Sequence, residues 1–183
     1  TFDVVIANTN DAPTLATAQA DETATEDTAY SVDVSGNFAD VDVGDTLTYT
    51  ATGMPSTMTM STAGVLSGTP LNADVGTSTV VVTATDGTAS ITDTFDVTVT
   101  NTNDLTTGTV TVTGDTYDDE VLTAVTSALA DDDGVGTFTY QWANQDGDVT
   151  GATSSTYTIP SCSAVTSTSC SVMGDTFTVT VIH

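Results

Sequence analysis

The stretch TFDVTVTNTND, residues 94–104, repeats almost letter for letter the opening stretch TFDVVIANTND, residues 1–11. Each copy alternates apolar with polar residues and then enters an Asn- and Asp-rich turn, the pattern of a half-buried β-strand that leaves a sheet. Self-similarity at the spacing of one small domain indicates a domain array. We therefore expect one domain over residues 11–104 and a second over 105–183. Residues 1–10 would be the last strand of a preceding repeat, or a spare strand donated to a neighbour.

Alternating segments recur along the chain and predict an all-β fold of two tandem β-sandwiches. They are rich in Thr, Val, Phe and Tyr, which favour strands, and Gly, Asp and Asn separate them. Short strands at regular intervals are typical of sandwiches. The single Trp, Trp142, ends one such segment and is expected to anchor a sandwich core. Clear examples are TLTYTAT (46–52), STVVVTAT (78–85), GTFTYQW (136–142) and TFTVTVI (176–182).

The charge of the chain is entirely one-sided. It has 25 acidic residues, no Lys, no Arg and one His, giving a net charge of −25. Nucleic acid is excluded as a partner because nothing can neutralise its phosphates, and no apolar run is long enough to span a membrane. The only His is the last residue, so a catalytic Ser would have no His to act as its base. There is also no Lys that could act in catalysis, and we therefore expect that the protein is not an enzyme.

The acidic residues also need something to offset their mutual repulsion. Oxygen ligands in Asp-rich loops suit hard cations, and Ca²⁺ first among them. The alternative is an acidic surface suited to a salty environment, in which each Asp only caps a turn.

Two cysteines, Cys162 and Cys170, lie in a Ser- and Thr-rich stretch near the end of the chain. No other Cys or His is near enough in sequence to complete a metal site. A local disulfide, which implies an oxidising compartment, is the favoured interpretation, and two free thiols are the alternative.

Several phrases of the first domain resemble the bacterial cadherin-like repeats of the dystroglycan-type group. The second domain resembles the immunoglobulin-like repeats of long bacterial surface adhesins, although a segment with both Cys replaces the usual acidic turn before its last strand. The first resemblance rests on FADVDVGDTLTY (38–49), GVLSGTP (64–70), NADVG (72–76), VTATDG (82–87) and NTND (101–104), and the second on LADDDGVGTFTYQW (129–142) and VTGATSSTYT (149–158).

The cadherin-like resemblance implies Ca²⁺ at the domain junctions, held by oxygen ligands from one domain, the linker and the next domain. At the start of the first domain it implies Asn8, Asn10, Asp11, Asp40, Asp42 and Asp86 as ligands, with Asp45 either a ligand or a turn cap. At the junction of the two domains it implies Glu26, Asp27, Asp74, Asn101, Asn103, Asp104, Asp131 and Asp133.

Together, these patterns predict a non-catalytic, extracellular structural or adhesion module, stiffened by calcium and part of a bacterial surface adhesin or fibre. Its partners would be neighbouring repeats or copies of itself. Two alternatives stay open. The chain could be a filament subunit that donates its N-terminal strand to another copy. It could also be an adhesin domain that binds a carbohydrate or another cell-surface ligand.

Overall fold

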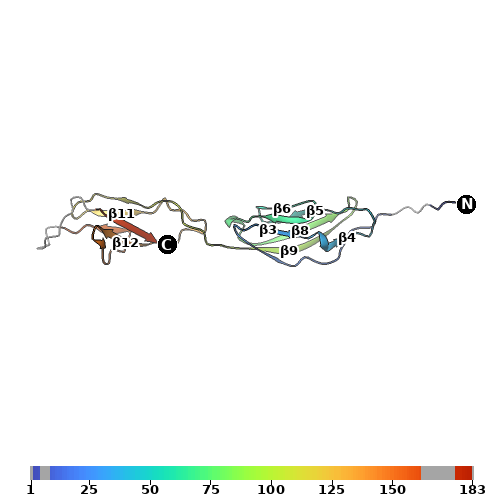
Figure 1. Ribbon diagram of the computed structural model, residues 1–183, viewed down its shortest axis with the longest axis horizontal. Helices are drawn as coiled ribbons and strands as arrows, with labels where there is room; N and C mark the ends of the chain where they lie inside the picture. Colours follow the sequence, from blue (N-terminus) through green and yellow to red (C-terminus); the bar gives the residue numbers. More distant parts are fainter. Residues whose placement is uncertain (1, 5–8, 162–175, 183) are drawn as a thin grey trace. The chain divides into compact units, whose positions relative to one another are not determined.

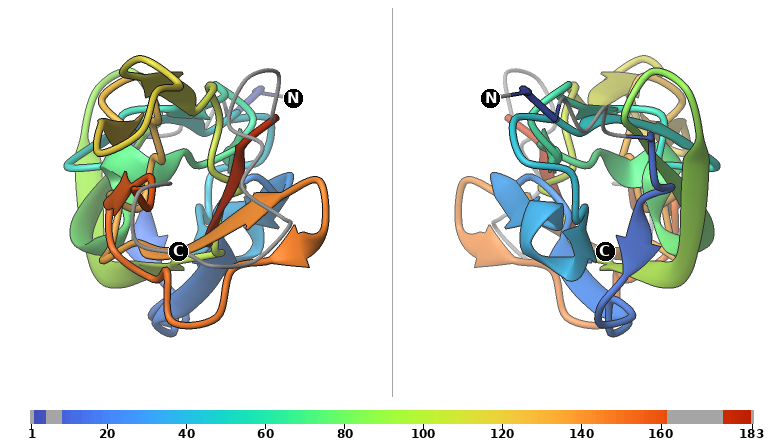
Figure 2. Two further views of the ribbon diagram at one scale, coloured as in Figure 1. Left: turned by 90° about the vertical axis from the view of Figure 1, so that its left-hand side faces the viewer. Right: turned by 90° about the vertical axis from the view of Figure 1, so that its right-hand side faces the viewer.

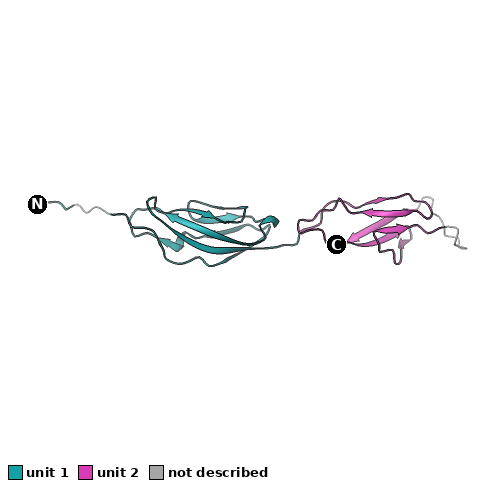
Figure 3. Cartoon of the chain, turned by 180° about the vertical axis from the view of Figure 1, so that it is seen from behind, with its two compact units in different colours: residues 1–103 teal, residues 104–183 magenta. Residues whose placement is uncertain are grey.

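The computed structural model describes residues 2–4, 9–161 and 176–182. The chain divides into two compact units, Thr1–Asn103 and Asp104–His183 (Figure 3). Within the described residues, two short 3-10 helices are the only helical elements and all other regular structure is β-strand (Figure 1), which confirms the all-β class. None of the helices described has the length and apolar character that crossing a membrane requires.

The first unit is built from a four-stranded and a three-stranded sheet, with a short two-stranded pair beside them. The large sheet has the order β2-β9-β8-β5 and the smaller one β3-β7-β6, and β1 pairs with β4. All pairs are antiparallel except β2 with β9, which run parallel. The strands are β1 (Thr14–Leu15), β2 (Glu22–Thr25), β3 (Tyr30–Asp33), β4 (Phe38–Ala39), β5 (Thr48–Thr52), β6 (Met58–Met60), β7 (Val65–Gly68), β8 (Gly76–Thr85) and β9 (Ser90–Thr100), with 3-10 helices η1 (Ser35–Asn37) and η2 (Asn72–Asp74).

The long strands β8 and β9 show why the alternating pattern gives this sheet. Val80, Val82 and Ala84 point inward from β8, while the intervening positions are only partly covered. Phe95 and Val97 do the same on β9, which pairs with β8 over ten positions. Because side chains alternate between the two faces of a strand, one face carries the core and the other carries Thr. Figure 2 shows β8 and β9, green to yellow-green, as one wall of this unit.

The second unit has two three-stranded sheets, ordered β10-β11-β14 and β13-β12-β15. Trp142 lies at its core, fully buried, as the sequence predicts; its indole Nε1–H donates to the Ser154 carbonyl oxygen at 2.9 Å, and its ring stacks on Tyr157. Leu122 and Ile159 complete the buried centre of the unit. The strands are β10 (Thr111–Thr113), β11 (Val121–Val125), β12 (Thr139–Asn144), β13 (Gly147–Asp148), β14 (Thr156–Thr158) and β15 (Thr178–Ile182).

Two expectations concern parts of the chain about which the structure says little. Cys162 and Cys170 lie outside the described residues, so their disulfide stays a prediction. Residues 2–4 and 9–10 are described and form no strand. The role of residues 1–10 as a last or donated strand also stays a prediction.

Candidate cation sites

The first acidic cluster lies in the loop between β4 and β5 of the first unit. Asp40, Asp42 and Asp45 each place a carboxylate oxygen within 4.8 Å of the others. The loop reverses tightly, since the Asp42 N–H donates to Asp40 Oδ1 at 2.9 Å and the Asp45 N–H donates to the Asp42 carbonyl at 3.3 Å. Gly44 has a φ of 108°, a conformation that costs glycine little. The sequence DVDVGD thus folds its acids toward one point.

The linker and the turn after β8 meet this loop. The Asp11 N–H donates to Asp42 Oδ2 at 2.7 Å, and the Asn10 side-chain amide donates to Asp86 Oδ2 at 3.1 Å. Backbone hydrogen bonds within its own turn, and then the bond from Asn10, hold the pKa of Asp86 below its usual range. Five of the six residues predicted for this site therefore lie at one end of the unit. They belong to three segments: the linker, the loop between β4 and β5, and the turn after β8. Asn8 lies outside the described residues.

The electrostatics of this loop favour a cation. Burial, and after it the carboxylates of Asp42, Asp40 and Asp86, raise the pKa of Asp45 above its usual range. Asp42 is 8% exposed, and Asp40 Oδ2 is buried without a hydrogen-bond partner. Carboxylate and carbonyl oxygens of this kind are the ligands that Ca²⁺ prefers. The donor set at this end therefore fits a hard divalent cation.

The second candidate site lies where β2 and β9 end, at the opposite end of the same unit. The Glu26 N–H donates to the Thr100 carbonyl at 3.0 Å and so extends the parallel pairing of the two strands by one residue. The Glu26 side chain is 1% exposed, and its Oε2 accepts a hydrogen bond from the Thr102 N–H at 3.2 Å. Its other oxygen, Oε1, is buried and has no hydrogen-bond partner.

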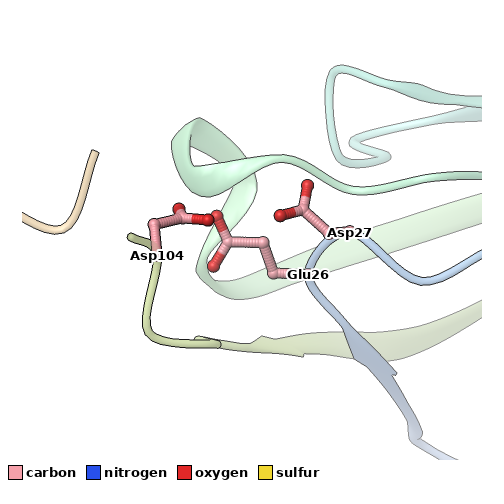
Figure 4. Close-up of side chains that lie close together, drawn as sticks. All are labelled: Glu26, Asp27 and Asp104. Atoms are coloured by element: carbon pink, nitrogen blue, oxygen red, sulfur yellow. The ribbon is translucent and has the colours of Figure 1, made fainter. Parts of the chain in front are cut away.

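Asp27 follows Glu26 on the same turn (Figure 4). Its φ of 56° is one that few residues other than glycine adopt. The Asp27 N–H donates to the Pro70 carbonyl at 2.9 Å, which helps to hold the turn. The linker residues Asn101 and Asn103 follow β9 and are exposed. Asp104, also drawn in Figure 4, is the first residue of the second unit.

In the second unit, the Asp131–Asp133 loop has the same local geometry as the Asp40–Asp42 loop. The Asp133 N–H donates to Asp131 Oδ1 at 3.0 Å, and the Asp104 N–H donates to Asp133 Oδ2 at 2.7 Å. Thr106 adds a hydroxyl bond to Asp131 Oδ2 at 2.9 Å. Thr106 was not predicted as a site residue, although aligning the two NTND linkers places it opposite Pro13.

Asp74, also predicted as a ligand, has a different environment. It is buried in η2, where Oδ1 accepts hydrogen bonds from the Ser56 N–H at 2.6 Å and the Ser56 hydroxyl at 2.7 Å. Oδ2 accepts one at 2.5 Å from the Thr57 hydroxyl and one at 3.3 Å from the Leu71 N–H. Burial alone would raise the pKa of Asp74, but these bonds lower it to about 2. The contacts assign Asp74 a structural role, joining η2 to the turn before β6.

The described part of the second unit also holds a small pocket of about 190 Å³. It is lined by Thr106, Val110, Leu129, Phe138 and Val181. Sites for drug-sized ligands usually enclose about 300–1,000 Å³. Among these five side chains, Thr106 offers a hydroxyl and the other four are apolar.

Residues 12–100 match the family model described as "Putative Ig domain". The first unit has an immunoglobulin-like fold. No curated protein sequence matches the chain.

Several solved structures are similar to the chain at low identity. They include an endo-fucoidan hydrolase of glycoside hydrolase family 107, which is 20% identical with a TM-score of 0.45 over 87% of this chain and 26% of that one. A "putative alpha-galactosidase" from Bacteroides fragilis is 13% identical with a TM-score of 0.40 over 52% of this chain and 19% of that one. A SusE-like surface-located polysaccharide-binding protein from Bacteroides thetaiotaomicron is 16% identical with a TM-score of 0.39 over 81% of this chain and 29% of that one. The chain therefore spans less than a third of each of these proteins.

Proposed function

We propose that the chain is a non-catalytic, extracellular structural or adhesion module whose immunoglobulin-like first unit binds Ca²⁺ at its two ends. The sequence resemblance of its Asp-rich loop to cadherin-like repeats, together with its acidic composition, supports this function. A module of this kind would extend or assemble a bacterial surface adhesin or fibre. Its partners would be neighbouring repeats or copies of itself.

The observation that carries the proposal is the Glu26 carboxylate. A carboxylate that is 1% exposed, with one oxygen unpartnered, costs free energy unless an opposite charge accompanies it. The chain has no Lys or Arg to supply that charge. A bound divalent cation would supply it, with Glu26, Asp27 and water as oxygen ligands.

The proposed cations would act on the linkers of the first unit. Asp11 and Thr102 belong to the segments that enter and leave this unit, and both already donate backbone N–H groups to candidate ligands. A short polar segment is flexible on its own. Cations at Asp42 and Glu26 would fix the carboxylates that these two N–H groups contact, and so stiffen both segments.

The proposal can be tested by titrating the full chain with CaCl₂ in an isothermal calorimeter at physiological NaCl. We expect saturable binding in the wild type and the loss of a site in Glu26→Gln and in Asp42→Asn. Asp146→Asn, which alters an exposed hairpin turn of the second unit, is the matched control and should bind as the wild type does. If the wild-type protein gives no binding heat with CaCl₂ and is not stabilised by calcium against thermal unfolding, the proposal is overturned.

A further inference from the structure

The two units enter their Asp-rich loops through the same set of hydrogen bonds. The backbone N–H of the linker Asp donates to a loop carboxylate at 2.7 Å in both cases, from Asp11 to Asp42 in one unit and from Asp104 to Asp133 in the other. Three residues later, the Thr14 and Thr107 hydroxyls donate to the carbonyl that precedes the loop, at 3.1 and 3.2 Å. The Asp-rich loops of the two units can therefore be compared position by position.

One carboxylate oxygen has different surroundings in the two loops. In the second unit, Asp131 Oδ2 accepts the Thr106 hydroxyl at 2.9 Å. The corresponding oxygen of the first unit, Asp40 Oδ2, is buried and has no hydrogen-bond partner. The linker residue at that position is Pro13, which has neither a side-chain donor nor a backbone N–H.

The number of nearby carboxylates also differs between the two loops, and again the first unit is the one better suited to a cation. In the first unit, Asp45 completes a group of three carboxylates within 4.8 Å. In the second unit, Asp133 is followed by Gly134, Val135 and Gly136, which supply no carboxylate. Among the described residues, the Asp131–Asp133 loop does not form such a group with other acids.

We infer that the linker position occupied by Pro13 in one unit and Thr106 in the other decides whether the loop takes a cation. In the second unit, the Thr106 hydroxyl takes the place of the ion, and the Asp131–Asp133 loop is a hydrogen-bonded turn that keeps its shape without calcium. In the first unit, Pro13 leaves Asp40 Oδ2 for the ion. This inference rests on the proposed function, because it assumes that the first unit binds calcium.

Trp142 makes the inference testable one unit at a time. It is the only Trp of the chain and is fully buried in the second unit, so its fluorescence reports the unfolding of that unit. The experiment follows thermal unfolding of the full chain, in millimolar Ca²⁺ and in chelator at matched ionic strength. A Glu26→Gln background keeps the other proposed ion out of the comparison. Calorimetry of the same samples gives the transition of the first unit.

We expect calcium to raise the midpoint of the first unit and to leave the Trp142 transition unchanged. Thr106→Val keeps the shape of Thr106 but removes its hydroxyl. It should lower the Trp142 midpoint in chelator by roughly 5 °C and make that midpoint rise with calcium. Thr107→Val removes a hydroxyl one residue away, which bonds to a carbonyl rather than to Asp131. It should leave the second unit insensitive to calcium.

Pro13→Thr is the converse change and should weaken the calcium response of the first unit. A Trp142 transition that rises with calcium in the wild type as much as the first transition does would overturn the inference, and so would a calcium-insensitive Thr106→Val variant. If neither transition responds to calcium in any of these variants, the inference fails. If the chain with Glu26 intact is also insensitive to calcium, the proposed function itself has failed.

Discussion

At the scale of single residues, Glu26 combines a buried carboxylate with an oxygen that has no hydrogen-bond partner. Its Oε1 atom is buried without a partner, so the ionised side chain should destabilise the first unit when no cation is bound. Glu26→Gln removes that charge and keeps the shape of the side chain. In chelator, we expect the variant to be as stable as the wild type or up to about 2 kcal/mol more stable.

Urea unfolding of the first unit in chelator and in calcium measures this effect. The order of stabilities should reverse in calcium, because the variant loses a ligand. A variant that is less stable than the wild type in chelator would mean that the Glu26 charge is already compensated within the protein.

Asp74 gives a prediction about pH. Its pKa is about 2 in the folded protein and near 3.8 in the unfolded chain. Since the folded pKa is the lower one, the stabilisation is fully present above about pH 4 and is lost as the pH falls toward 2. Asp74→Asn should lower the free energy of unfolding at pH 7 by about 2 kcal/mol, with the deficit shrinking at low pH.

The measurement is urea unfolding of wild type and variant at pH 7 and pH 2.5. Effects of the other titrating acids are common to both proteins and cancel in the difference between their free energies of unfolding. Equal stability of the two proteins at both pH values would show that the four hydrogen bonds to Asp74 contribute little.

At the scale of elements, the turn after β5 depends on Gly53. It has a φ of 75°, and a Cβ atom placed on it would lie 2.2 Å from the Thr79 carbonyl oxygen on β8. Gly53→Ala should therefore destabilise the first unit by about 1–3 kcal/mol or more, through strain and the forced separation of the strands. Gly36→Ala in η1 is the control, because open space surrounds it and its φ is not in the left-handed region. Calorimetry would contradict this account if both variants melted together.

Much of the architecture could be predicted from the elements that the sequence encodes. The alternation over β8 and β9 is strong enough to predict both strands. The sequence motifs that resemble cadherin-like repeats predicted that Asp40, Asp42 and Asp86 belong to one site. The parallel pairing of β2 with β9 could not be read from sequence, because it joins segments far apart in the chain. That pairing places Glu26 against Thr102. The structural role of Asp74 also escaped prediction, since its donors at Ser56 and Thr57 lie in another turn.

At the scale of the whole molecule, the net charge of −25 has no internal counter-charge. Repulsion among these acids opposes folding, and salt shortens its range from about 10 Å at 0.1 M to about 3 Å at 1 M. We expect the melting midpoints of both units to rise as NaCl increases over this range. Calorimetry at fixed pH measures the rise. Midpoints that stay constant or fall would show that the acids lie too far apart to affect stability.

The central claim is that the first unit binds calcium specifically, beyond the general effect of salt. Its most direct test is a thermal melt of the full chain in millimolar Ca²⁺, in Mg²⁺ and in chelator, at matched ionic strength. A ligand that binds only the folded state raises the midpoint by mass action. The account predicts a clear rise of the first transition in Ca²⁺, little change in Mg²⁺, and loss of part of the rise in Glu26→Gln. Identical curves in the three solutions would contradict it and would identify the acidic clusters as hydrogen-bonded turns on a solvated surface.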